Sequence, residues 1–306
     1  MRYILENEQI KAEIESFGAE LKSLVDKETG QEYMWEADPA FWGKTSPILF
    51  PFIGKLEGAA YLHEGKRYEI EKHGFARDME FIAADREEDK ITFLLKSGEE
   101  TLQKFPFDFW LEITYVLAEK SILEKWRILN KGTGSMCFSI GGHPAFACPP
   151  KSGRADTGQR RTECVLKLYD ESLQPYGKSE VWSTEIMVPE GLLSGVSFPL
   201  QVEDSVIPVG EHIFDRDALC LERQGVGAVG ICDAKGREYV RLEADCPVWG
   251  IWSVPDSNAA YICLEPWWGI CDSKGYQGTL QERPYTNVLE AGGVWEQGFT
   301  VRIVSS

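Results

Sequence analysis

The stretch Leu111-Glu112-Ile113-Thr114-Tyr115-Val116-Leu117 decides the fold class. Its odd-numbered residues are all apolar, and the polar Glu112 and Thr114 stand between them. A repeat of two residues is the pattern of a strand that has one face in a core and one toward solvent. Similar runs occur at 10–14 and near 79–86, 90–97, 121–129, 163–168, 217–223, 238–244, 259–265 and 296–304. We therefore predict roughly a dozen strands or more.

Turn and helix signals complete this pattern. Segments of turn-forming residues separate the runs at 26–30, 64–66, 130–132 and 234–236. Helical patterns are short and confined to 97–104, 38–43 and 214–218, and none is long enough to cover a parallel sheet. The chain is therefore predicted to be all-β, a large antiparallel β-sandwich. No fixed-period repeat suggests a propeller or solenoid, and no break in composition marks a linker, so 1–306 is predicted to be a single domain.

Composition narrows the possible partners. The 306 residues carry 32 Lys and Arg against 49 Asp and Glu, a formal net charge of −17. Nucleic acids and anionic membranes bind basic surfaces, so we expect neither as a partner, although one or two local cations would suffice for a small phosphorylated ligand. The first residues lack an apolar leader, and no apolar run reaches the length of a membrane span of about 18 residues. We expect a cytoplasmic protein without a membrane segment.

Cysteine usage agrees with that compartment. None of the eight cysteines belongs to a CxxC pair, and most lie in apolar runs, at positions 137, 148, 164, 220, 232, 246, 263 and 271. A buried free cysteine behaves as a small hydrophobic residue. We therefore predict reduced thiols and no disulfide framework.

Three polar islands interrupt the apolar runs: His73-Gly74-Phe75-Ala76-Arg77, Gly141-Gly142-His143-Pro144 and Cys263-Leu264-Glu265-Pro266-Trp267. Together they supply two imidazoles, a guanidinium and a carboxylate, with tryptophans beside the carboxylate. Loops at strand ends often present functional side chains from a rigid scaffold. This set of groups suits acid–base chemistry on a neutral, hydroxylated ring, and nothing else in the chain indicates a cofactor.

His143 and Glu265 are the strongest of these candidates. The two glycines before His143 permit close backbone approach or unusual φ, and Pro144 restricts the histidine to an extended conformation. Histidine suits proton transfer near neutral pH. Glu265 ends an apolar run, and burial beside Trp267 and Trp268 would raise its pKa toward that of a general base. The alternative is a structural carboxylate that pairs with an arginine such as Arg77.

Other interpretations have weaker support. Two histidines and a glutamate can bind a metal ion, but no HxH, HxxxH or HExxH spacing occurs, so no metal site is predicted. No GxSxG motif or glycine-rich phosphate loop indicates a serine hydrolase or a nucleotide enzyme. The loop-like segment 149–158 directly follows the His143 island and is either a flap over a site or a plain surface excursion. Aromatic rings stack on the C–H faces of sugars, which makes the tryptophans near the islands a mild indication of carbohydrate: Trp42, Trp249, Trp252, Trp267 and Trp268.

The islands and their surroundings resemble the aldose 1-epimerases, or galactose mutarotase-like proteins, and within them the LacX-like branch. The resemblance rests on the segments 46–56, 61–77, 142–146, 263–267 and 287–293, in this order along nearly the whole chain. It implies a β-sandwich with an open sugar cleft, and interconversion of the α and β anomers of a hexose without a cofactor. By this resemblance Glu265 is the general base for the C1 hydroxyl, and His143 is the general acid for the ring oxygen.

The same resemblance assigns the binding residues. His73 and Arg77 are expected to hold sugar hydroxyls or the ring oxygen, and Trp267 to lie beside the sugar. An acidic ligand has no clear counterpart, and Asp245 and Asp272 are the candidates, of which Asp272 is preferred. Lys55, with Arg77 and Lys72, is a candidate cationic pocket for a sugar 6-phosphate.

Three alternatives to a hexose mutarotase remain at this stage. They are a hexose-6-phosphate mutarotase, a carbohydrate-binding or sensing protein on the same fold, and, with least support, a glycosidase, for which no second acid can be located. The expected partner is a monosaccharide, and the chain is expected to be a monomer or homodimer.

Overall fold

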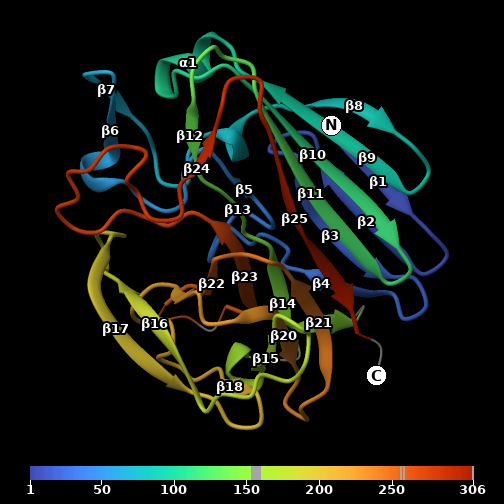
Figure 1. Ribbon diagram of the computed structural model, residues 1–306. Coiled ribbons are helices and arrows are strands. Elements are labelled where there is room, and N and C mark those ends of the chain that lie inside the picture. Colours follow the sequence, from blue (N-terminus) through green and yellow to red (C-terminus); the bar gives the residue numbers. More distant parts are fainter. Residues whose placement is uncertain (153–159, 256, 258, 305–306) are drawn as a thin grey trace.

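Two large antiparallel sheets packed face to face form the body of the molecule (Figure 1). The computed structural model describes residues 1–152, 160–255, 257 and 259–304. The predicted all-β sandwich is confirmed, because strands dominate these residues and helices are few and short. None of the helices in the described part of the chain is long and apolar enough to cross a membrane.

Among the described residues, the first sheet has twelve strands. In spatial order they are β1 (Arg2–Glu6), β2 (Ile10–Glu15), β3 (Glu20–Asp26), β4 (Gln31–Met34), β14 (Ala145–Ser152), β23 (Tyr261–Trp268), β22 (Val248–Trp252), β19 (Leu219–Glu222), β16 (Glu180–Ile186) and β17 (Leu193–Gln201), with β13 (Ile140–Gly142) beside β23 and β5 (Ile48–Leu49) beside β13. The sheet therefore joins strands from the beginning, the middle and the end of the chain.

The second sheet has nine strands within the part of the chain that the structure describes. Their order is β18 (Val206–Pro208), β15 (Val165–Asp170), β20 (Val226–Cys232), β21 (Glu238–Glu243), β25 (Val294–Ile303), β11 (Ser121–Asn130), β10 (Phe109–Ala118), β9 (Lys90–Lys96) and β8 (Ile82–Arg86). Two ribbons pair β12 (Met136–Phe138) with β24 (Asn287–Leu289) and β6 (Ala60–His63) with β7 (Lys66–Glu69). The helices are α1 (Glu99–Lys104) and the 3₁₀ turns η1 (Glu57–Ala59), η2 (Ala76–Asp78) and η3 (Arg161–Glu163).

The alternation of residues along β10 explains which face of this strand is buried in the second sheet. In β10 the predicted inner residues Leu111, Ile113, Tyr115 and Leu117 are buried, and the residues between them are half-buried. Burying one face of each strand against the other sheet removes apolar area from water, which favours folding by about 25 cal/mol per Å². The period of two therefore fixes which face of β10 enters the core.

β23 differs because both of its faces are buried. Ile262, Leu264 and Trp268 lie in the core between the two sheets. Cys263 and Trp267, which point the other way, belong to two smaller apolar clusters on the opposite face of the same sheet. A strand buried on both faces reads as a continuous apolar run, so the polar Glu265 within it stands out.

Two short helix predictions were wrong. α1 confirms the helix expected within 97–104, but 38–43 and 214–218 are turns and irregular backbone. In the second segment, Asp217 has a φ of +63°, which a right-handed helix does not allow. The segment 149–158 begins as the end of β14, and its remaining residues 153–158 lie outside the described residues, so its predicted role as a flap stays a prediction.

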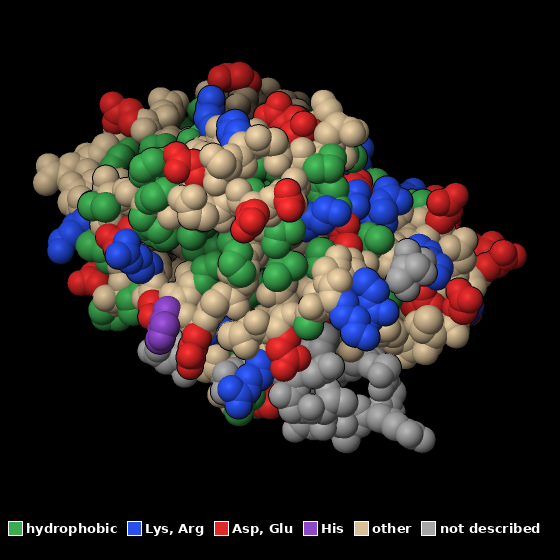
Figure 2. Space-filling view, turned by 90° about the horizontal axis from the view of Figure 1, so that it is seen from below, with side chains coloured by type: hydrophobic (Ala, Val, Ile, Leu, Met, Phe, Trp, Pro, Cys, Tyr) green, Lys and Arg blue, Asp and Glu red, His purple; other side chains and the backbone are tan. Residues whose placement is uncertain are grey.

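The face seen from below in the orientation of Figure 1 carries acidic and basic side chains among hydrophobic ones (Figure 2). The two signs of charge are interspersed there, and no continuous basic surface covers the part drawn in colour. A nucleic-acid-binding face would present such a basic surface. The absence of a nucleic-acid partner stays a prediction.

Candidate active site

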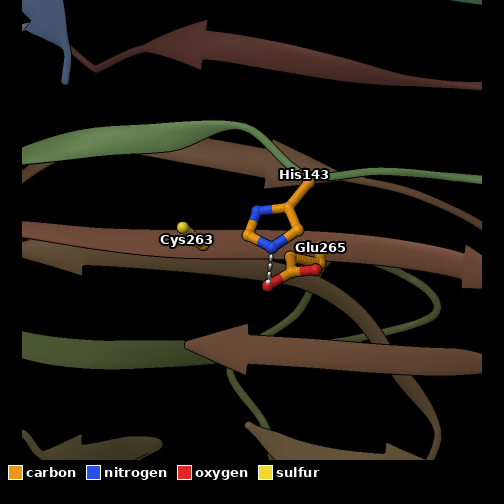
Figure 3. Close-up of side chains that lie close together, drawn as sticks. All are labelled: His143, Cys263 and Glu265. Atoms are coloured by element: carbon orange, nitrogen blue, oxygen red, sulfur yellow. Dashed lines mark ion pairs between the residues drawn. The ribbon is translucent and has the colours of Figure 1, made fainter. Parts of the chain in front are cut away.

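His143 and Glu265 are cross-strand neighbours on the twelve-stranded sheet. Gly141 pairs with Trp267 across β13 and β23, and the antiparallel register two residues further along brings His143 opposite Glu265. Cross-strand partners on one face lie close enough for their side chains to touch. Here Nε2 of His143 lies 3.2 Å from Oε1 of Glu265 (Figure 3). Sheet register therefore brings together two groups that are far apart in the sequence.

Trp267 follows Glu265 by two residues on β23 and contacts its carboxylate directly. Its Nε1–H donates to Oε2 of Glu265 at 3.2 Å. A Cβ atom on Gly141 would lie 2.8 Å from the indole, and one on Gly250 of β22 would lie 2.3 Å from it. Both neighbouring strands therefore need glycine, because the ring occupies the space of their side chains. At Gly141 the requirement is close approach rather than an unusual φ.

Burial controls the protonation of the pair. Glu265 is 1% exposed, and burial raises its pKa well above the ordinary value, against the opposing effects of the Trp267 hydrogen bond and the charge of Lys72. Burial also lowers the pKa of His143 to about 3, helped by the positive charges of Lys72 and Arg77. Two groups in contact titrate as a unit. Burial therefore favours a neutral imidazole beside a protonated carboxyl, with one proton in the contact between Nε2 and Oε1.

His73 is held in one tautomer by the backbone. It adopts a φ of +69° in the turn after β7, and its backbone N–H donates to the carbonyl of Gly54 at 2.8 Å. In return the N–H of Gly54 donates to Nδ1 of His73 at 3.1 Å. Burial lowers the pKa of His73 well below the ordinary value, so the ring is neutral. Since Nδ1 accepts a hydrogen bond, the ring proton is on Nε2, which makes that atom a donor.

Two cations and one acid stand near the histidines. The Nη2 of Arg77 donates to the carbonyl of Lys72 at 2.8 Å, and its Nε lies 3.4 Å from Asp78. The Nζ of Lys72 lies 4.0 Å from a carboxylate oxygen of Asp217. Asp217 is held by the N–H of Ala218, which donates to its Oδ1 at 2.8 Å. Arg77 therefore pairs with Asp78, and Glu265 pairs with His143 rather than with an arginine.

An open cavity connects these side chains to solvent. Its empty volume, with the open mouth included, is about 690 Å³. Trp42, Trp252 and Trp267 supply aromatic walls, and the polar groups are those described above. Trp42 stacks on the imidazole of His143 with ring centroids 4.7 Å apart. Aromatic faces around a few convergent polar groups suit a ring that has both C–H faces and hydroxyls.

The cavity brings together five of the seven predicted site residues: Glu265, His143, His73, Arg77 and Trp267. Lys55 and Asp272 are not among the residues that line it. Asp272 forms a buried ion pair with Arg283, at 2.8 Å, and its other oxygen accepts the N–H of Glu57. That carboxylate is already satisfied, so nothing in the structure aims it at a ligand.

Some expectations from the sequence missed the site. Asp217 lines the cavity, although the sequence predicts a helical segment there and no local pattern marks Asp217 as a site residue. Two of the five tryptophans lie elsewhere: Trp249 and Trp268 face the core between the sheets. The other acidic candidate, Asp245, lies on the surface outside this cavity.

Comparisons with known proteins show which family the chain resembles. The family model described as "Aldose 1-epimerase" matches residues 1–182. The chromosomal LacX protein of Lactococcus lactis subsp. lactis is 32% identical over 295 residues, which cover 93% of this chain and 94% of that protein.

Two solved structures share the whole fold. A galactose mutarotase related enzyme from Lactobacillus acidophilus has a TM-score of 0.89 and 32% identity, with 100% of this chain and 98% of that chain covered. A galactose mutarotase-like protein from Lactobacillus casei has a TM-score of 0.88 and 28% identity, with 99% and 100% covered.

Proposed function

Because the chain belongs to the aldose 1-epimerase family, we propose that it interconverts the α and β anomers of a hexose, with Glu265 and His143 as the proton-transfer pair. The observation that carries this proposal is the buried contact of 3.2 Å between the two groups at the wall of an open cavity. Mutarotation needs one acid and one base near a hemiacetal and no redox group. A pair that shares one proton supplies both.

The proposed steps leave the number of protons on the pair unchanged. Glu265, as carboxylate, takes the proton of the C1 hydroxyl while protonated His143 gives its proton to the ring oxygen. The bond between C1 and the ring oxygen breaks, and C1 becomes an aldehyde. After rotation about C1–C2 the ring oxygen attacks the other face of C1, and both protons return. The pair ends with the proton it began with, so turnover needs no cofactor.

The empty site rests in the other tautomer, with neutral imidazole and protonated carboxyl, because burial disfavours both charges. Reaching the reactive tautomer requires moving the proton across the contact between Nε2 and Oε1. The Trp267 N–H stabilises the carboxylate so formed. Sugar hydroxyls that bind in the cavity would add further hydrogen bonds to the ion pair.

The remaining cavity groups suit the binding of hydroxyls. Neutral His73 offers its Nε2–H as a donor, Arg77 offers guanidinium donors, and Asp217 offers a carboxylate acceptor. We propose Asp217, in place of Asp272, as the acidic sugar ligand. Trp267 and the other aromatic walls would pack on the C–H face of the ring.

A measurement of anomer exchange tests the proposal. NMR exchange between the α and β signals of glucose and galactose should be accelerated by the protein and lose at least about 100-fold in Glu265→Gln, since positioned proton transfer contributes about 10²–10⁴-fold. Glu124→Gln is a matched control, because it neutralises a buried carboxyl of the other sheet. Full activity of Glu265→Gln would refute the assignment. Sugar binding without acceleration would favour a binding protein.

One observation favours a second candidate, a hexose-6-phosphate mutarotase. Lys72 and Arg77 both line the cavity, and their acidic partners hold them loosely: Asp217 lies 4.0 Å from Lys72, and Asp78, which lies 3.4 Å from Arg77, also pairs with Lys44. A phosphate group would form charge-assisted hydrogen bonds with both cations. If glucose 6-phosphate is the substrate, Lys72→Met should raise its KM strongly and leave the KM of glucose nearly unchanged. Equal effects on both sugars would contradict this candidate.

A further inference from the structure

A thiol stands beside the proton-transfer pair and has no part in the chemistry proposed above. Cys263 and Glu265 are two residues apart on β23, so their side chains leave the same face of the sheet. The register places Ala145 opposite Cys263, and its small side chain leaves the sulfur next to His143. Figure 3 shows the thiol and the carboxylate on the same strand, with the imidazole beside both.

The three donor atoms are spaced as ligands of one ion. One donor atom from each of His143, Cys263 and Glu265 lies within 4.8 Å of the others, and all three residues are buried. Zinc binds imidazole at about 2.0–2.1 Å, carboxylate at about 2.0–2.2 Å and thiolate at about 2.3 Å, which sets its ligands roughly 3–4 Å apart. Small side-chain rotations are therefore enough to bring the three donors onto one ion.

Charge balance also favours a divalent ion here. Thiolate and carboxylate carry two negative charges and the imidazole none, so a dication gives a neutral cluster in a buried place. On binding, the ion replaces the proton shared by His143 and Glu265 and the proton of the thiol, and both leave to solvent. The soft thiolate selects zinc-like ions over magnesium or calcium, which prefer oxygen ligands.

The surroundings indicate reversible binding rather than a resident ion. A histidine that holds a metal firmly usually donates its second ring nitrogen to a carboxylate or carbonyl. The Nδ1 of His143 is buried and has no hydrogen-bond partner among the described residues. His143 and Glu265 line the cavity, so an ion can reach them from solvent, and a bound sugar would exclude it.

We propose that Zn²⁺, or another thiophilic divalent ion, binds His143, Cys263 and Glu265 and reversibly inhibits the enzyme by occupying its proton-transfer pair. The site takes three protein ligands and leaves the fourth position toward the cavity. The inhibitory effect rests on the proposed function, but the binding of the ion does not.

Binding is measured first, without turnover. Chelator-treated protein is titrated with Co²⁺, and thiolate coordination is read from the charge-transfer absorption that sulfur–cobalt bonds give in the near ultraviolet; Zn²⁺ should abolish the band by displacement. Cys246→Ser, which removes a half-buried thiol outside the cluster, should keep the band. Cys263→Ser and Cys263→Ala should both lose it, and two replacements guard against one that fails to fold.

Inhibition is measured next, by the rate of anomer exchange. Zn²⁺ should inhibit the wild type, and a chelator should restore its activity. At higher sugar concentrations, more Zn²⁺ should be needed for half-inhibition, because the sugar and the ion compete for the site. Replacing Cys263 should raise the Zn²⁺ concentration for half-inhibition at least about tenfold, since even changes to residues that only support the ligands lower metal affinity 10–100-fold. A band that survives in both Cys263 variants, or no band in the wild type, overturns the site. A band in a protein that accelerates no anomer exchange would instead overturn the proposed function.

Discussion

Glu124 is a second buried carboxyl, in the core between the sheets, and it makes stability depend on pH. It is 4% exposed on β11, accepts the Nε1–H of Trp126 at 2.8 Å, and lies opposite Tyr115 in the register. No ion pair reaches it within the described residues. Burial raises its pKa from 4.5 to about 7, against the opposing hydrogen bond from Trp126.

The sign and size of the effect follow from this shift. The folded protein holds the proton more tightly than the unfolded chain, so the stabilising contribution is complete below the unfolded pKa and is lost as pH rises through the folded pKa. The difference between the two pKa values, at about 1.4 kcal/mol for each pKa unit, gives a total of about 3–4 kcal/mol. Between about pH 5 and about pH 8.5 the expected loss of stability is about 2–3 kcal/mol.

The test compares Glu124→Gln with the wild type by urea unfolding across this pH range. Glutamine keeps the shape and the acceptor for Trp126 but does not ionise. The free energy of unfolding of the variant should therefore rise by about 2–3 kcal/mol relative to that of the wild type between the acidic and the basic end. Glu265 also has a raised pKa, but it is present in both proteins and cancels in the difference. Glu112→Gln, on the outward face of β10, is the control and should follow the wild type.

A difference between Glu124→Gln and the wild type that stays constant from acid to base would refute the reasoning. It would mean that the carboxylate is solvated or paired when ionised. A parallel shift in the Glu112→Gln control would point to general charge effects instead.

Three further predictions concern the site and its support. Gly250→Ala should lower the rate of anomer exchange at least about tenfold, because its methyl group would lie 2.3 Å from the Trp267 ring; an unchanged rate would contradict the close approach. Trp267→Phe removes the donor that opposes the raised pKa of Glu265, so the basic limb of the pH–rate profile should move to higher pH, and a move to lower pH would contradict this role. Asp272→Asn leaves Arg283 buried without its carboxylate, and chemical denaturation should show a loss of about 3–5 kcal/mol; a loss below about 1 kcal/mol would mean that water reaches the pair.

The sequence determined the fold class and named several of the side chains that meet in the cavity. Alternation along a strand such as 109–118 is a property of one segment, and it fixes which side chains face a core whatever that strand pairs with. The predicted all-β sandwich was therefore confirmed. The three polar islands likewise named five of the residues that meet in the cavity, because histidine, arginine and glutamate are conspicuous in apolar strands.

Short-range patterns failed where backbone conformation depends on distant contacts. Residues 38–43 and 214–218 have helical spacing but lie in turns that cover the site, and Asp217 takes a left-handed conformation there. An aspartate in such a turn looks like any surface acid in the sequence. Its position beside Lys72 is a matter of tertiary packing.

Only the tertiary structure decided which strands are neighbours. The register of β23 against β13 and β14 sets His143 opposite Glu265 and leaves Cys263 beside them, although more than a hundred residues separate His143 from the other two. The same packing places Asp272 in an ion pair with Arg283 instead of in the lining of the cavity. Strand pairing is chosen by the burial of whole sheets, a sum over distant segments that no local repeat records, and that is why the sequence predicted the parts of the site but not their contacts.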